Sequence, residues 1–591
     1  MRIRKRCARK VLGHHAILCA QQVSSMGFVG GADDFSYALR YRANDVPKKT
    51  TALLLGLQQM MVCISGLLVV PYIVAEKACA GDGELALRAT LISTTFVVTG
   101  VGTILQSTLG LRLAILQGPS FAFLPPLLAY FSSYECKSTM NDHVPEEEWL
   151  GRIQIISGSL FCASLLLVVV GSCGLVGTIA KHLGPVTITP VVFLLCISNV
   201  HVVIEKAKLH WISVAEYVLL MIFALYLSEV CVPLPTIRNG RLATARVRLF
   251  GEFPYLTSML IAWAICFFMT LTDIEPVGGE ARTDNNATLD ILYNAPWVNV
   301  PYPGQFGMPR IDIGLFLGFI ASCLGCLIES LGNYDIASKV SEEPHADAAT
   351  ANRAIIVEGI GCALAGAMGI GVGVTTYSEN IAVLKITRVA SRITLQVAGV
   401  LLIVLGLFTK VGAAFSTLPS AMIGGILGMG ISMIVGVALA NLQYIDLKLS
   451  RNVTIIGVAI IAGLCVSDYF EQNPLSTGYD EADRVFNLLI RIRMVVGGLI
   501  AFALDNTVGG ATRRQRGLKE KSRADVSTVE KAAEKDGYAF PDCVNRFLLK
   551  VPLLTVLPFL PSKEKLKCAL RTDSTTAIEE PQTYIATVKI C

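Results

Sequence analysis

A carboxylate and an amide stand side by side in a glycine-rich break of an apolar segment. Glu379 and Asn380 follow four closely spaced glycines, Gly366, Gly369, Gly371 and Gly373. A charged side chain at membrane depth is costly, and interrupted backbone there offers N–H groups that no helix uses. These residues therefore predict a binding site for a small polar substrate.

Glu329 is a second carboxylate in an apolar setting. It directly follows the apolar run 313–328, and Asn333 lies one helical turn further along the same face. A carboxylate at the centre of a membrane helix costs about 2.5 to 3.5 kcal/mol on insertion scales, so we expect it to bind substrate. A structural hydrogen bond is the alternative. Glu216 and Glu358 lack matching polar neighbours and are assigned to structural pairing.

The elements that must position these groups are membrane helices. The chain has 591 residues, of which 53% are hydrophobic and only 16% are charged, and its mean hydropathy is +0.58. A soluble fold of this size could hardly bury that much apolar surface. Apolar runs recur from residue 53 to residue 504, and two broken segments near Phe121 and Ile381 bring the count to about fourteen spans. The sequence predicts an all-α polytopic membrane protein.

Basic residues predict how the chain is oriented. They cluster at 2–10, 238–248 and 513–521. The positive-inside rule places all three clusters in the cytoplasm, and an even number of spans satisfies this. We expect a cytoplasmic arm at 1–50, a transmembrane transporter domain at 51–508 and a cytoplasmic tail at 509–591. Because topogenic charge explains these clusters, they call for no nucleic acid partner.

The sequence also contains an internal repeat. The first predicted span opens near Thr51 and the eighth near Asp312, and the broken segment 118–122 matches 377–382 at nearly the same offset. Such a repeat is typical of inverted-repeat transporters, in which two interrupted segments meet near the bilayer midplane. Pro119 suits a helix break better than a helix interior. Ordinary kinked spans are the alternative.

Some residues are candidates for a disulfide, for glycosylation or for metal binding. Cys79 and Cys136 lie in predicted outside loops, so a disulfide between them is a hypothesis that the sequence leaves open. Asn286 begins a glycosylation sequon in an outside segment, whereas the sequon at Asn452 lies near the cytoplasmic face and is expected to be silent. The pair Cys323 and Cys326 has no second pair or histidine nearby and is assigned to core packing.

Taken together, several motifs resemble the nucleobase-ascorbate transporter family, particularly its animal branch of sodium-dependent ascorbate and nucleobase carriers. They are Gln117-Gly118-Pro119-Ser120-Phe121-Ala122-Phe123, Pro301-Tyr302-Pro303, Glu329-Ser330-Leu331-Gly332, Asn441-Leu442-Gln443-Tyr444, Ser450-Arg451-Asn452 and Asp505-Asn506-Thr507-Val508. The family signature reads here from Glu379 to Arg388 and departs from the pattern only at Ala382, where the family has Gly.

The resemblance implies a fold and a site. Two seven-span inverted repeats would form a core domain and a gate domain, usually in a homodimer, with an elevator-like shift of the core. Glu329 and Glu379 would bind substrate through their side chains, Phe121 by stacking beside Ser120, and Asn380 by supporting the site.

The resemblance also implies sodium symport at the plasma membrane, with no resident cofactor. Asn333, Gln59, Thr387 and Arg388 would serve coupling or gating. Many members have His where this chain has Gln59, Asp where it has Asn333, and Asn where it has Val372. These departures leave a uniporter and a proton-coupled carrier open.

The residue at position 379 favours one substrate class. In the family, Pro at this position goes with ascorbate, and Gln or Glu goes with nucleobases. Ascorbate is an anion, and a carboxylate about 4 Å away would cost up to roughly 4 kcal/mol at an effective dielectric near 20. We therefore expect uracil or purines, with ascorbate transport or a non-transporting sensor as alternatives. No nucleophile with a positioned base, phosphate loop or metal cluster points to an enzyme.

Overall fold

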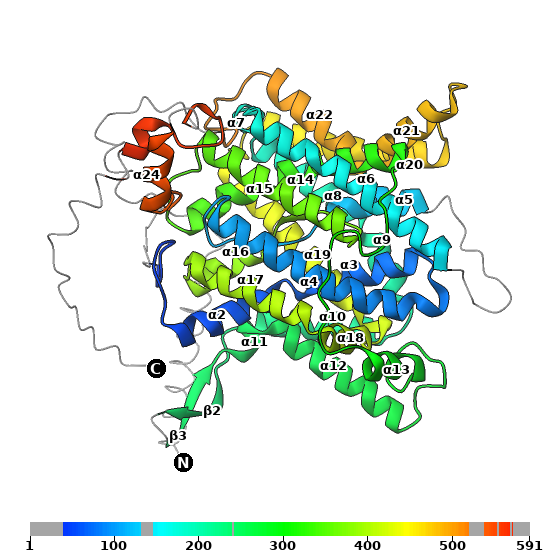
Figure 1. Ribbon diagram of the computed structural model, residues 1–591. Coiled ribbons are helices and arrows are strands. Elements are labelled where there is room, and N and C mark those ends of the chain that lie inside the picture. The colour runs from blue at the N-terminus through cyan, green and yellow to red at the C-terminus, as the bar shows by residue number, and fades with distance from the viewer. Residues whose placement is uncertain are drawn as a thin grey trace, which may run out of the picture. The chain divides into compact units, whose positions relative to one another are not determined.

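The chain folds mainly into helices, because in a membrane each backbone polar group must find its partner within the protein. The computed structural model describes residues 39–131, 146–238, 241–518, 537–551, 555–567 and 570 (Figure 1). From Arg40 onward these residues belong to one unit.

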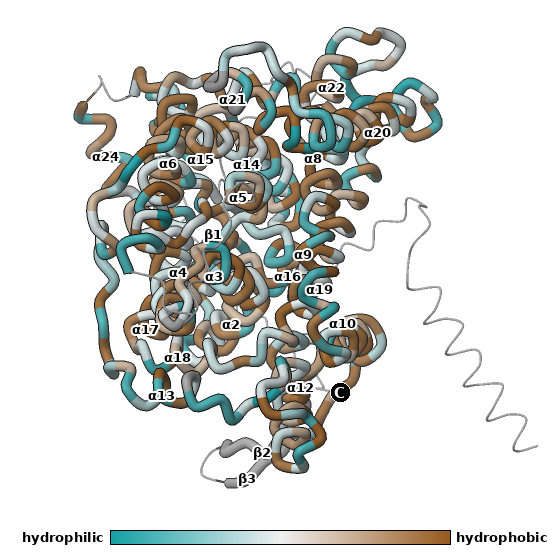
Figure 2. Tube along the Cα trace, turned by 90° about the vertical axis from the view of Figure 1, so that its right-hand side faces the viewer, coloured by the Kyte–Doolittle hydropathy of each residue, from teal (hydrophilic) through white to brown (hydrophobic). Residues whose placement is uncertain are grey.

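The membrane helices form two groups that lie side by side in Figure 2. The core group contains α2 (Lys49–Val62), α3 (Ile64–Lys77), α4 (Glu84–Thr108), α5 (Leu124–Phe131), α6 (Glu146–Ser172), α14 (Ile313–Val340), α15 (Ala348–Met368), α16 (Ser378–Thr387) and α17 (Arg392–Leu407). The gate group contains α8 (Pro185–Ser198), α9 (Val200–Ala207), α10 (Ile212–Met221), α12 (Pro254–Leu271), α19 (Ser420–Ala440), α20 (Ser450–Gln472) and α22 (Arg493–Thr507).

Shorter elements connect these helices or lie at their ends. They are α7 (Leu175–Ile179), α11 (Leu249–Glu252), α13 (Asn286–Asn294), α18 (Thr409–Ser416), α21 (Asp480–Arg491), α24 (Asp542–Lys550) and the hairpin of β2 (Val232–Arg238) and β3 (Arg241–Val247). In Figure 1, α24 and the hairpin lie toward the left, and α13 and α21 lie toward the right. We name these two sides of the protein the α24 side and the α13 side.

The helices confirm a polytopic membrane fold. Within the described residues, 8 helices are long and apolar enough to cross a membrane, or up to 11 if each bent pair is one span. The shorter apolar helices 121–131 and 212–226, together with α16, add partial spans. The count of about fourteen spans therefore stays a prediction.

Two short strands pair at the centre of the core group, and we call this pair the strand crossing. Strand β1 (Gln117–Pro119) pairs antiparallel with β4 (Val374–Thr376), with Gly118 opposite Thr375. Each strand leads into a short helical segment, β1 into η2 (Phe121–Phe123) with α5, and β4 into α16. The equivalent pairs α4 with α17 and α6 with α15 pack along each other around this crossing. The arrangement matches the predicted repeat of 118–122 and 377–382.

Glycines let the gate helices approach closely. A Cβ atom at Gly424 would lie 2.8 Å from the backbone nitrogen of Ala207, and one at Gly428 would lie 3.2 Å from the Tyr217 ring. Helix α19 can therefore pack directly against α9 and α10, as the spacing of these two glycines predicts.

A buried ion cluster joins three parts of the gate group. The Asp505 carboxylate of α22 is fully buried and accepts hydrogen bonds from Arg451 at 2.8 Å and from Arg516 at 2.9 and 3.0 Å. Arg451 belongs to the first turn of α20, and Arg516 belongs to the segment that follows α22. The cluster explains two of the sequence motifs, because their charged residues meet here.

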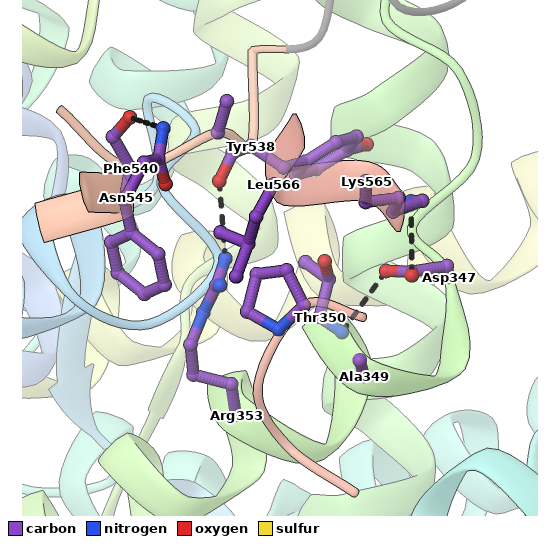
Figure 3. A pocket seen from close by; sticks show the side chains of 11 residues that line it. Asp347, Ala349, Thr350, Arg353, Tyr538, Phe540, Asn545, Lys565 and Leu566 are labelled. Atoms are coloured by element: carbon purple, nitrogen blue, oxygen red, sulfur yellow. Dashed lines mark hydrogen bonds and ion pairs between the residues drawn. The ribbon is translucent and has the colours of Figure 1, made fainter. Parts of the chain in front are cut away.

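The C-terminal segment returns to the core group and docks on the first turns of α15 (Figure 3). Arg353 donates to the carbonyl of Tyr538 at 3.3 Å, and its guanidinium carbon lies 4.4 Å from the centroid of the Phe540 ring. Phe540 also packs with Leu548 and Leu566 in a small hydrophobic cluster. Part of the predicted tail is thus folded against the membrane helices.

An ion pair at the edge of this contact stabilises the fold only over part of the pH range. Lys565 Nζ lies 3.0 Å from the carboxylate of Asp347, which caps α15 through the amide of Thr350. Burial alone would raise the pKa of the Asp347 carboxyl, but Lys565 and Thr350 outweigh burial and hold that pKa below its usual value. The stabilisation is therefore present above the usual carboxyl pKa and is lost as the pH falls through the lowered value.

Replacing Phe540 with alanine should release the docked segment. The change removes a buried ring and its contact with Arg353, so we expect protease cleavage within 537–566 of the purified protein to become at least about tenfold faster. Phe547 provides the control, because it lies seven residues further along the same docked segment, in α24, and is 59% exposed. Equal cleavage of Phe540→Ala and Phe547→Ala would contradict the docking.

The modification sites lie as follows. Cys79 is bonded in a disulfide, and its predicted partner, Cys136, lies outside the described residues. Asn286 is exposed at the start of α13. Asn452 is buried and its amide donates to the carbonyls of Asp446 and Gln515, which leaves it inaccessible to a glycosyltransferase.

Candidate substrate site

The strand crossing brings the starts of two short helices together. Ser120 accepts a hydrogen bond from the Ala122 amide at 3.2 Å and so caps η2. Tyr377 precedes α16, which has no side-chain cap. First-turn N–H groups of a helix have no partner within the helix, so the start of α16 can donate to a ligand.

The crossing depends on the absence of a side chain at Gly118. A Cβ atom there would lie 2.6 Å from the Tyr377 ring. The Tyr377 hydroxyl in turn donates to the carbonyl of Pro119 at 3.0 Å. This ring lies across β1 and fixes where α16 begins, and with it the position of Glu379.

The two predicted carboxylates lie in this region and are both buried. Glu329 comes from α14 and Glu379 from the first turn of α16. Glu379 accepts a weak hydrogen bond from Ser378 at 3.4 Å. One oxygen of Glu329, Oε2, is buried with no hydrogen-bond partner among the residues that the structure describes. A buried carboxylate oxygen without a donor is costly, so Glu329 is suited to receive a donor from a ligand.

A small enclosed cavity lies between the core and gate groups beside Glu329. Its lining includes Glu329 and Asn333 of α14, Ser378 of α16, Ile188 of α8, Ala438 of α19 and Asn441. Its volume of about 10 Å³ has room for about one water molecule. A larger ligand therefore requires the core and gate groups to separate slightly at this point.

A wider cavity of about 660 Å³ continues from this one toward the α24 side. Ile188, Gly332 and Asn441 line both cavities, and the wider one extends to Asp347 and Leu518. We call the wider cavity the vestibule. It gives the enclosed cavity a route to one side of the protein.

Asn380 holds the two halves of the crossing together. Its side-chain oxygen accepts a hydrogen bond from the Leu116 amide at 3.1 Å, and its amide group donates to the Gln59 side chain of α2. Asn380 thus supports the site rather than facing the cavity, and Gln59 is its direct partner.

Alanine at position 380 should weaken the core. The change leaves the buried Leu116 amide and the Gln59 oxygen without this partner, which costs about 1–3 kcal/mol. We expect a lower thermal midpoint for the purified protein in detergent. Asn473→Ala is the control, since Asn473 is exposed and, among the described residues, its side chain bonds only to the carbonyl of Tyr469 at the end of α20. Equal midpoints for the two variants would show that the Asn380 contacts contribute nothing.

The other predicted residues differ in where they lie relative to the enclosed cavity. Asn333 lines the enclosed cavity and donates to the carbonyl of Thr376 at 2.8 Å. Phe121 is buried at the start of η2. Thr387 and Arg388 lie at the far end of α16, where the Thr387 hydroxyl bonds to Val383 within the helix and Arg388 ends it with a φ of 56°. These last two do not reach the cavity.

A hydrogen-bond network around Glu358 supports the site from behind. The Glu358 carboxylate of α15 accepts hydrogen bonds from Ser330 at 2.6 and 2.8 Å and from the Tyr334 hydroxyl at 2.8 Å. Thr376 of β4 donates to it at 3.4 Å, and Gln106 of α4 donates to Tyr334. Sequence spacing could not reveal these partners, apart from the polar run that begins at Glu329.

Carboxyl groups dominate the site. Glu329 interacts electrostatically with both Glu358 and Glu379. Within the described part of the chain, no Lys, Arg or His forms an ion pair with any of these three groups. The site can therefore bind a ligand that brings N–H donors, a cation or protons, and it disfavours an anion.

The family model and the sequence relatives place the chain in one family. A family described as "Permease family" matches residues 50–472. Solute carrier family 23 member 2 of Rattus norvegicus is 37% identical over 549 residues, which cover 90% of this chain and 84% of that protein. Nucleobase-ascorbate transporter 11 of Arabidopsis thaliana is 29% identical over 548 residues, which cover 85% and 74%. The transmembrane domain of a cyanobacterial bicarbonate transporter, BicA, aligns with a TM-score of 0.40 at 12% identity, over 77% of this chain and 99% of that one.

Proposed function

Since the chain belongs to the nucleobase-ascorbate transporter family of membrane carriers, we propose that it is a secondary active transporter of nucleobases, uracil or purines. The observation that carries the proposal is the unpartnered Oε2 of Glu329 beside a second buried carboxylate, Glu379. Glu329 lines the enclosed cavity that continues into the vestibule, and Glu379 directly follows Ser378, which lines the same cavity.

Nucleobases have the matching chemistry. They are neutral and planar, and they present N–H groups that can donate to carboxylates in charge-assisted hydrogen bonds. A carbonyl of the same ring can accept from the first-turn N–H groups of α16. A site built on such contacts rejects analogues without the N–H by up to about 10⁴-fold or more, because the carboxylate then stays unpaired.

Ascorbate is the alternative substrate. Its negative charge would lie near Glu329, Glu358 and Glu379, and within the described residues no basic side chain pairs with them. A bound cation would have to offset that repulsion, about 4 kcal/mol for each carboxylate 4 Å away at an effective dielectric near 20. This cost supports nucleobases as the first choice.

Sodium is the proposed coupling ion, and a proton is the alternative. The resemblance implies sodium, but Asn333 and Gln59 stand where many members carry a carboxylate and an imidazole. The Asn333 amide group is bonded to Thr376, and the Gln59 oxygen to Asn380. The three buried carboxylates have no basic partner in the part of the chain that the structure describes, and this favours proton coupling as the second candidate.

The transport cycle would proceed by an elevator-like shift of the core group against the gate group. We propose that the α24 side is cytoplasmic, that both termini lie there, and that the protein works at the plasma membrane as a homodimer. The vestibule would then be the cytoplasmic exit. Light scattering of the purified protein and glycosylation at Asn286 test the dimer and the orientation.

Uptake measurements test the substrate and the ion together. Cells expressing the chain are given labelled uracil, hypoxanthine or ascorbate, in sodium buffer, in sodium-free buffer and at two external pH values. We expect saturable nucleobase uptake that depends on sodium. Uptake that follows the proton gradient instead would assign the proton, and ascorbate uptake alone would refute the nucleobase proposal. Substrate binding to purified protein without any uptake would indicate a non-transporting sensor.

A further inference from the structure

Two helix ends carry complementary pairs of charges. Helix α3 ends near Glu76 and Lys77, and α9 ends near Glu205 and Lys206. Glu76 forms an ion pair with Lys206, and Lys77 Nζ lies 3.5 Å from the carboxylate of Glu205. Each helix thus contributes one acid and one base, and each charge meets its opposite on the other helix.

These ion pairs connect the two groups of helices. Helix α3 packs against α4 and β1 of the core group, and α9 packs against α19 of the gate group. Tyr72, about one turn before Glu76, adds a hydrogen bond from its hydroxyl to the carbonyl of Leu418, just before α19, at 2.8 Å. A displacement of the core group along the gate group has to break these contacts.

The ion pairs lie on the side opposite the vestibule. Glu76 and Lys206 line a polar cavity of about 860 Å³, which also includes Glu280 and Asn286 and therefore lies on the α13 side. Among the described residues, this cavity shares no lining residue with the enclosed cavity at Glu329, whereas the vestibule shares three. The substrate site is thus closed toward the α13 side in this state.

Burial makes the pair between Glu76 and Lys206 the stronger of the two. The Lys206 residue is only 9% exposed, whereas 52% of the Glu205 side chain is exposed. A buried ammonium needs either its carboxylate or water. Since Glu76 and Lys206 both line the polar cavity, water there can replace the ion pair when α3 and α9 move apart.

We propose that the ion pair between Glu76 and Lys206, supported by the one between Lys77 and Glu205, is a latch that closes the substrate site toward the α13 side. When the latch opens, the site can face that side instead of the vestibule. The inference rests on the proposed transport function. It adds the residues that hold the protein in the state in which the substrate site faces the vestibule.

Site-directed labelling from each side of the membrane tests the latch. A reporter cysteine replaces Val437, which lines the enclosed cavity, and a membrane-impermeant maleimide is applied to intact cells and to inside-out vesicles. Peptide-resolved mass spectrometry reads the reporter alone. In the otherwise unchanged chain we expect labelling mainly from the vestibule side. Lys206→Glu or Glu76→Lys should raise labelling from the opposite side by at least about tenfold.

Charge exchange separates a latch from a general disturbance. The double variant Glu76→Lys with Lys206→Glu restores the attraction and should return labelling to its original level. Glu84→Lys is the matched control, because Glu84 lines the same cavity but pairs with Arg88 within α4. If a reversal lowers the amount of folded protein, Lys206→Gln removes the charge without repulsion and should give a smaller increase.

Two results would overturn the latch: unchanged labelling in the single variants, or a double variant that labels as fast as they do. Nucleobase uptake plays no part in this readout. A failure of the proposed substrate therefore leaves the labelling result intact, and a failure of the latch leaves the uptake result intact.

Discussion

Cells that express the Glu379→Ala variant should take up labelled uracil or hypoxanthine about 10- to 150-fold more slowly than cells with the unchanged chain, at equal amounts of protein in the membrane. Alanine removes the carboxylate and is compatible with the helix. The loss corresponds to one hydrogen bond to a charged group, about 1.5–3 kcal/mol. The uptake rate at low substrate concentration is the quantity to compare, because it reports the full binding loss.

Two further variants sharpen this result. Glu379→Pro also removes the carboxylate, and proline is tolerated in the first turn of a helix, so α16 should still form. It should lose nucleobase uptake to at least the same extent. Glu471→Gln removes a charge at an exposed position of α20 and should leave uptake unchanged. Full nucleobase uptake in both Glu379 variants would remove this carboxylate from the site.

The largest loss of stability is expected for Asp505→Asn. The change leaves Arg451 and Arg516 without the carboxylate that they share, and breaking a buried ion pair on one side costs about 3–5 kcal/mol. Because the cluster joins α20, α22 and the segment that follows, the gate group should unfold at a lower temperature. Thermal unfolding of the purified protein in detergent measures the effect.

A surface ion pair of similar geometry provides the control. Asp468 lies 2.8 Å from Arg493, but half of its side chain is exposed. Exposed pairs contribute about 0–1 kcal/mol, so Asp468→Asn should hardly change the unfolding temperature. Should both variants unfold at the same temperature, burial would not be what makes the Asp505 cluster important.

Several features of the site could be predicted from the sequence because they depend on local pattern. The cost of a carboxylate in an apolar run pointed to Glu329 and Glu379, and both are buried in the region of the helix breaks. Proline and glycine next to Phe121 and Ile381 indicated those breaks. The repeat indicated that they would meet, and β1 pairs with β4.

Other features could not be predicted, because they depend on which distant residues meet. Glu358 was assigned to structural pairing, but its donors Ser330, Tyr334 and Thr376 come from a different helix and a strand. Asn441 reaches the cavity from the gate group. No local pattern reveals a neighbour that only the packing of two helix groups provides.

The docking of the C-terminal segment on α15 could not be predicted from the sequence either. Tyr538 and Phe540 stand in a stretch with little apolar periodicity, so nothing local indicates that they meet Arg353. The contact forms because the start of α15 offers a guanidinium for the ring and the carbonyl.

This docked segment also affects how the protein is made. Tyr538 and Phe540 are translated after all the membrane helices that the structure describes, so the first turns of α15 receive their cover late in synthesis. A premature stop codon between residues 519 and 536 would yield a chain with all the membrane helices that the structure describes and with Asp505 still paired to Arg516. Arg353 would keep its bond to the Gly110 carbonyl but lose the ring beside it. Cellular quality control would then act on a transporter whose described membrane helices are present but whose α15 start is uncovered.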